Sequence, residues 1–131
     1  MTDPKELNPD RQVGGVLTST LMDLERSIVQ TGGDAGLLRE LCSVLASDIP
    51  HYMEEASLAF ESDDLAAVQV HMRSLRAACA TVGASQVNAI AMLVEAHAKA
   101  DDLHGARCKF EQLKGLASVL ATELSQWSVR K

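Results

Sequence analysis

The stretch DLAAVQVHMRSLRAACATVGA, from Asp64 to Ala84, decides the fold of this chain. Its apolar side chains recur at steps of three and four residues: Leu65, Val68, Met72, Leu75, Cys79 and Val82. At 100° of turn per residue, these six positions fall within an arc of about 100°, the width of a seam that packs against a core. Gly83 suits the left-handed backbone conformation that ends a helix. The stretch therefore predicts an amphipathic helix that stops just before Gly83.

Similar apolar spacing continues on both sides of this helix. A preceding helix is expected to begin after an N-cap at Asp34 and to end at a polar connection over residues 61–64. Pro50 lies inside it and predicts a kink or, alternatively, a break, because proline lacks the N–H that an inner helix position donates. The expected seam of this helix is Leu38, Leu41, Leu45, Ile49, Tyr52 and Ala56. The two later helices are expected to bury Val87, Ile90, Leu93, Val94 and His97, then Leu103, Ala106, Phe110, Leu113, Ala117, Leu120, Leu124 and Trp127.

The beginning of the chain differs in character from the rest. Residues 1–15 are polar and contain two prolines, so we expect a flexible leader there. A short helix is expected next, with the stripe Leu17, Leu21, Leu24 and Ile28. Four long amphipathic segments joined by connections of a few residues favour antiparallel neighbours. The sequence thus predicts an all-α protein: an up-and-down antiparallel four-helix bundle over residues 16–131, with a short additional N-terminal helix.

The amino-acid composition of the chain argues against nucleic acid and membranes as binding partners. Twelve basic against 18 acidic residues give a formal net charge of −6, which repels nucleic-acid phosphates and anionic lipid. No apolar run approaches the roughly 18 residues that span a bilayer, and the first residues lack a signal-peptide core. We expect a cytoplasmic monomer that binds neither nucleic acid nor membrane. Its three cysteines, Cys42, Cys79 and Cys108, are expected to be buried thiols.

The helix predicted over residues 65–82 leaves two arginines on its outer face. Arg73 lies about 135° from the centre of the seam and must point to solvent. Gln69, Arg76 and Ala80 share that side, and Ala66, Val70 and Ala77 lie just beyond. Arginines set among small residues favour close approach by a protein partner. The alternative is an ordinary solvated face, because alanine is a good helix former.

Three pieces of the sequence, in this order and spacing, carry a family resemblance. They are Thr31 to Asp34 with the following Leu37 to Leu41, then Asp48 to Glu55, then Asp64 to Val68 with Arg73, Leu75, Arg76, Ala77, Val82, Gly83 and Ala84. Together they resemble the histidine phosphotransfer (HPt) domains of two-component relays. The resemblance implies a four-helix bundle whose third helix presents a phosphoacceptor to a receiver domain, which contributes its own acidic pocket and Mg²⁺.

The functional positions of that family are changed in this chain. The resemblance places Arg73 where the family has its phosphoacceptor histidine, Arg76 at the neighbouring lysine and Ala77 at the glycine that lets the receiver come close. A guanidinium stays protonated and has no free lone pair, so it cannot accept a phosphoryl group as a neutral imidazole can. The resemblance then implies a degenerate member, a pseudo-HPt protein that keeps the docking surface and lacks the chemistry.

The leading interpretation is a non-catalytic module that binds the receiver domain of a response regulator or hybrid histidine kinase and modulates a phosphorelay. Its expected contact residues are Gln69, Val70, Arg73, Arg76, Ala77 and Ala80. Two alternatives stay open: phosphotransfer through His71, and a helical adaptor for a partner that is not a receiver. No Ser-His-Asp set, phosphate-cradling glycine loop or metal-ligand cluster can be assembled from the sequence, so we expect no catalytic residue, metal or cofactor.

Overall fold

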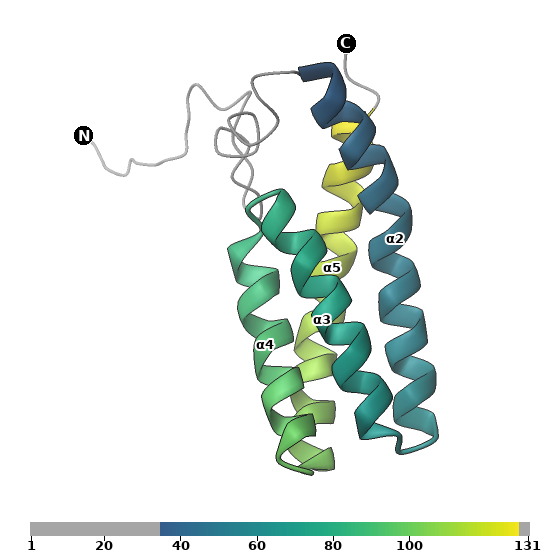
Figure 1. Ribbon diagram of the computed structural model, residues 1–131, viewed down its shortest axis with the longest axis vertical. Helices are drawn as coiled ribbons and strands as arrows, with labels where there is room; N and C mark the ends of the chain where they lie inside the picture. The colour runs from purple at the N-terminus through teal and green to yellow at the C-terminus, as the bar shows by residue number, and fades with distance from the viewer. Residues whose placement is uncertain (1–34, 129–131) are drawn as a thin grey trace, which may run out of the picture.

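The computed structural model describes residues 35–128, which form four helices and no strand. These are α2 (Ala35–Glu61), α3 (Leu65–Thr81), α4 (Ser85–Lys99) and α5 (Leu103–Ser128). The helices run side by side with alternating direction, and α2 and α4 each pack against both α3 and α5 (Figure 1). The predicted helical bundle is therefore confirmed. The predicted leader and the additional N-terminal helix lie outside the described residues.

All three connections between these helices are built alike. Each is three residues long, at 62–64, 82–84 and 100–102. Its middle residue has a positive φ, and the N–H of its last residue donates to the carbonyl five residues back, as in a Schellman motif. The positive-φ residues are Asp63 (53°), Gly83 (66°) and Asp101 (61°). The closing bonds are Asp64 N to Ala59 O at 2.8 Å, Ala84 N to Cys79 O at 2.9 Å and Asp102 N to His97 O at 2.8 Å. The predicted helix end at Gly83 is confirmed.

The same short connections also start the following helices. Asp64 is the N-cap of α3, and its side chain accepts a hydrogen bond from the Ala67 N–H at 3.1 Å. Asp102 does the same for α5, accepting from the Gly105 N–H at 3.0 Å. At these two connections one residue both closes a helix and caps the next, so the chain reverses direction within three residues. At the third connection Ala84 is the N-cap of α4 and makes no side-chain cap hydrogen bond.

The core is a single apolar cluster along the bundle axis. On α3 the predicted seam is confirmed, because Val68, Met72, Leu75, Cys79 and Val82 are fully buried and Leu65 packs against them. The α5 seam is buried from Ala106 to Leu124, with Leu103 and Trp127 partly buried at its ends. On α2, Leu38, Leu45, Ile49 and Ala56 of the predicted seam are buried, and Cys42 and Phe60 join them. The other two predicted residues, Leu41 and Tyr52, are partly buried against the core.

The predicted α4 seam is partly wrong. Leu93 is 40% exposed, and His97 and Ile90 are only half-buried. The buried positions are Val87, Ala91, Val94 and Ala98. The apolar run at residues 89–94 offers two possible seams, and the bundle uses the one that contains alanines, because their small side chains let α4 lie close to its neighbours.

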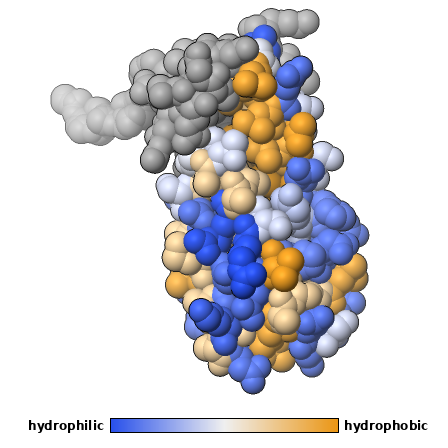
Figure 2. Space-filling view, viewed as in Figure 1, coloured by the Kyte–Doolittle hydropathy of each residue, from blue (hydrophilic) through white to orange (hydrophobic). Residues whose placement is uncertain are grey.

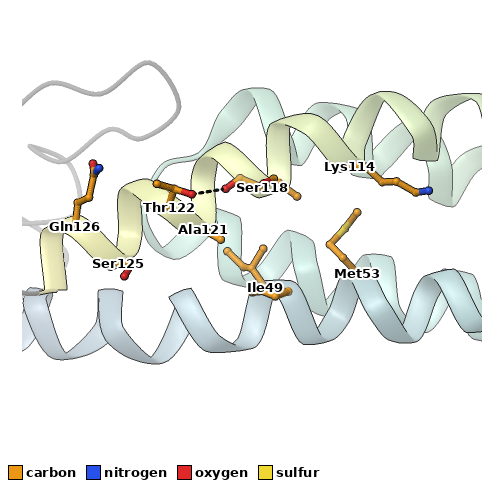
Figure 3. A pocket seen from close by; sticks show the side chains of 10 residues that line it. Ile49, Met53, Lys114, Ser118, Ala121, Thr122, Ser125 and Gln126 are labelled. Carbon is orange, nitrogen blue, oxygen red and sulfur yellow. Dashed lines mark hydrogen bonds between the residues drawn. The ribbon is translucent and has the colours of Figure 1, made fainter.

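Helix α2 continues through Pro50, so the predicted break does not occur. Pro50 is exposed and lines an open groove of about 530 Å³ between α2 and α5. Ile49 and Met53 of α2 point toward α5 there, opposite Ala121, and the hydroxyl of Thr122 lies nearby, donating to the Ser118 carbonyl at 3.1 Å (Figure 3). The small residues of α5 therefore leave this groove open between the two helices.

The four helices differ in length. Helices α2 and α5 have 27 and 26 residues, whereas α3 and α4 have 17 and 15. The difference of about ten residues corresponds to roughly 15 Å, and the long pair extends beyond the short pair at the end where α2 begins (Figure 1). Leu37 and Val44 of α2 are 47% and 55% exposed at that end, where hydrophobic residues gather on the surface (Figure 2). None of the helices within residues 35–128 is both long and apolar enough to cross a membrane.

Candidate docking surface on α3 and α4

Arg73 is the central residue of α3, with eight helical residues on either side. Its side chain is 61% exposed, as its position opposite the buried seam requires. The arginine that stands at the phosphoacceptor position of the resemblance thus lies on a regular, well-packed helix and points outward.

The neighbouring helix contributes an acidic partner. The Nε of Arg73 donates to Oε2 of Glu95 at 3.1 Å, and Nη1 of Arg76 donates to Oε1 of the same carboxylate at 2.6 Å. The Nε of Arg76 also donates to Oδ1 of Asn88 at 3.1 Å. We call these four residues the Arg73–Glu95 cluster. It joins α3 to α4 by three hydrogen bonds, and its two guanidinium groups and one carboxylate leave one net positive charge.

The two arginines occupy different environments. The Arg76 side chain is 32% exposed and holds two partners on α4, one of them Glu95, whose side chain is only 16% exposed. Arg73 holds Glu95 through Nε alone, and among residues 35–128 its Nη1 and Nη2 atoms have no hydrogen-bond partner. Exposed ion pairs contribute little stability, typically about 0–1 kcal/mol. Arg76 connects α3 to α4 through two partners, whereas Arg73 still has N–H donors that a binding partner could use.

Most side chains around the Arg73–Glu95 cluster are apolar, and several of them are small. Val70 is 52% exposed, Ala77 and Ala80 are exposed, and Gln69 is half-buried. On α4, Met92 lies between Asn88 and Glu95 on one stripe of the helix and is 45% exposed. The predicted contact residues of α3 thus share one face, and α4 extends that face with side chains that the sequence prediction did not include.

The pairing of the two helices about the turn at Gly83 is enough to predict these contacts from the sequence. The turn at Gly83 folds α4 back along α3, so residues at similar distances from it face each other. Arg73 lies ten residues before Gly83 and Glu95 twelve after it, and Arg76 lies seven before and Asn88 five after. Pairing the two predicted helices about this glycine would have placed a carboxylate beside Arg73.

The four histidines lie apart from this surface. His71 is half-buried and two residues from Arg73, which turns it about 160° around α3. His51 and His104 are exposed on other helices. His97 Nδ1 lies 2.9 Å from Oδ2 of Asp102. The pKa of Asp102 is lowered first by the hydrogen bond from the Gly105 N–H and then by the one with His97, which suits a cap of α5.

The cysteines divide into two kinds. Cys42 and Cys79 are fully buried, and burial raises the pKa of both thiols, that of Cys79 to about 12. Cys108 is exposed, so the expectation that all three are buried is wrong. Position 108 falls between the seam residues Ala106 and Phe110 of α5, and its Sγ lies 3.7 Å from Nε2 of His104. Across the described part of the chain, no three His, Cys, Asp or Glu side chains converge as a metal site would require.

Comparison with known proteins adds no relative to this description. The chain matches no protein-family model, no curated protein sequence and no solved structure at a significant level.

Proposed function

We propose that this chain is a non-catalytic, pseudo-HPt binding module that docks through α3 and α4 on the receiver domain of a response regulator or hybrid histidine kinase. It would modulate a phosphorelay without carrying phosphate. The observation that carries the proposal is Arg73, outward at the centre of α3 with its Nη atoms open, at the position where the resembled family has its phosphoacceptor.

The chemistry of that side chain defines the mode of binding. A guanidinium cannot take up a phosphoryl group, but its fork of N–H donors matches a carboxylate in bidentate geometry. Arg73 would project into the receiver's acidic pocket and pair with unphosphorylated carboxylates where Mg²⁺ would otherwise bind. The protein would then favour the resting receiver and compete with its activating partners. The open Nη atoms and the low alanines around Arg73 support such close approach.

The test is a binding titration of wild type and Arg73→Ala against candidate receivers, with and without Mg²⁺. A desolvated arginine–carboxylate contact contributes about 2 kcal/mol or more, so the variant should bind about 30-fold more weakly, mainly through a faster off-rate. Mg²⁺ should weaken the wild type but not the variant. Equal affinities in all four measurements would refute the pocket mode of binding.

A matched control separates the site from a general loss of charge. Arg107 on α5 is also exposed and also holds an ion pair, at 2.7 Å to Asp63 in the α2–α3 connection, and neither residue is among the proposed contact residues. Arg107→Ala should therefore leave receiver affinity unchanged. If no receiver binds at all, an adaptor for another protein surface takes precedence. Acid-labile phosphate on His71 after incubation with a phosphorylated receiver would replace the proposal with an active relay.

A further inference from the structure

Glu95 presents to Arg73 the same chemical group that the proposed partner would present. Its carboxylate, which α4 carries, bridges the two arginines of α3, and the Glu95 side chain is 16% exposed. In the free protein, the outward guanidinium is therefore already partly neutralised by a carboxylate of its own chain.

We infer that Glu95 is a built-in competitor, an internal carboxylate that a docking partner must displace from Arg73 and that thereby sets which partners bind. The inference rests on the proposed function, because it concerns the regulation of the same surface. Exchanging one exposed carboxylate for another yields little net attraction. A partner gains only if it offers more than one carboxylate or holds them in a desolvated pocket. The surface would therefore select clustered carboxylates over isolated acidic residues.

The cluster can release Arg73 without leaving a buried charge unpaired. When Arg73 leaves, Oε1 of Glu95 keeps its 2.6 Å contact with Arg76, and Arg76 keeps Asn88 at 3.1 Å. Only the exposed 3.1 Å contact is lost. A buried carboxylate left without a partner would oppose release, since uncompensated buried charge is strongly unfavourable. Because Arg76 stays paired with Glu95, Arg73 is free to bind a partner.

The experiment is the substitution Glu95→Gln, which keeps the shape and the acceptor for Arg76 and removes the charge. Receiver affinity should rise about two- to fivefold at low salt, the range expected for removing one exposed competing ion pair. In an Arg73→Ala background the same change should give no gain. Glu111→Gln is the matched control, because Glu111 is the acid of an exposed ion pair with Lys114 on α5, 2.9 Å apart. Unchanged or weaker binding of Glu95→Gln would overturn the inference.

A readout without any partner separates this inference from the proposed function. Inorganic phosphate serves as the oxyanion probe, followed through the Arg73 Nε–H resonance by nuclear magnetic resonance. Glu95→Gln should shift that resonance and tighten the phosphate titration, whereas Glu111→Gln should do neither. An unchanged resonance and titration would overturn the inference whatever the receivers do. If both change as expected while no receiver responds to Arg73→Ala, the competitor role holds and the receiver proposal fails.

Discussion

At the scale of single residues, the proposed function depends on which side chain stands at position 73. An imidazole has a neutral form with a nucleophilic nitrogen, and a guanidinium has none at physiological pH. Arg76 keeps a basic side chain near this position, whereas Ala77 adds one methyl group relative to the glycine of the resembled family. If these two positions account for the lost phosphotransfer, reversing both should restore it.

The double substitution Arg73→His with Ala77→Gly tests this. The histidine supplies the acceptor nitrogen, and the glycine removes one methyl from the approach path. After incubation with a phosphorylated receiver, we expect acid-labile phosphate on the double variant, measured by radiolabel transfer with and without acid treatment. Ala77→Gly alone is the control and should stay unlabelled. A double variant that remains unlabelled would count against the register that places Arg73 at the acceptor position.

At the scale of helices and turns, the positive-φ residues define the connections. Two of the three are aspartates, which reach left-handed geometry less readily than glycine does. Within residues 35–128 the Asp101 side chain makes no hydrogen bond or ion pair, whereas that of Asp63 pairs with Arg107 at 2.7 Å. The Asp101 position is therefore where a backbone effect can be measured by itself.

Asp101→Gly should stabilise the bundle by about 0.5–1 kcal/mol, because the left-handed conformation no longer crowds a Cβ atom. Gly83→Ala should destabilise it by about 1 kcal/mol for the opposite reason. Both values would come from urea unfolding monitored by circular dichroism, with unchanged m-values. Equal stability of all three proteins would mean that turn geometry does not limit this fold.

The helices also show which features the apolar spacing predicts and which it does not. Three-and-four spacing found the seams of α3 and α5, since each of those helices has one apolar stripe. On α4 the spacing is ambiguous, because Leu93 fits the apolar pattern although Ala91 and Ala98 occupy the core. The bond from Arg73 to Glu95 spans 22 residues, so no local pattern could predict it. Local periodicity specifies faces, and contacts between faces require the register of the turn.

At the scale of the whole molecule, the bundle protects two thiols and exposes one. Cys42 and Cys79 lie in the core with raised pKa values, and Cys108 is on the surface of α5. The thiolate is the reactive form, so burial suppresses reaction twice, by access and by ionisation.

Titration of the native protein with Ellman's reagent at pH 8 should therefore modify one thiol, and after unfolding in guanidinium it should modify three. Cys108→Ser should abolish the native reaction, and Cys42→Ser, as the matched control, should not. Rapid reaction of two or three thiols in the native state would show that the core opens far more readily than its packing indicates.

The three connections, each shared between two helices, bear on binding at this scale as well. A three-residue connection closed by a backbone hydrogen bond leaves neighbouring helices little freedom to move against each other. The outer faces of α3 and α4 are held together further by Arg76. A protein that docks on them as proposed would bind a preformed surface. The conformational entropy lost on association would then come mainly from a few long side chains and hardly from the backbone.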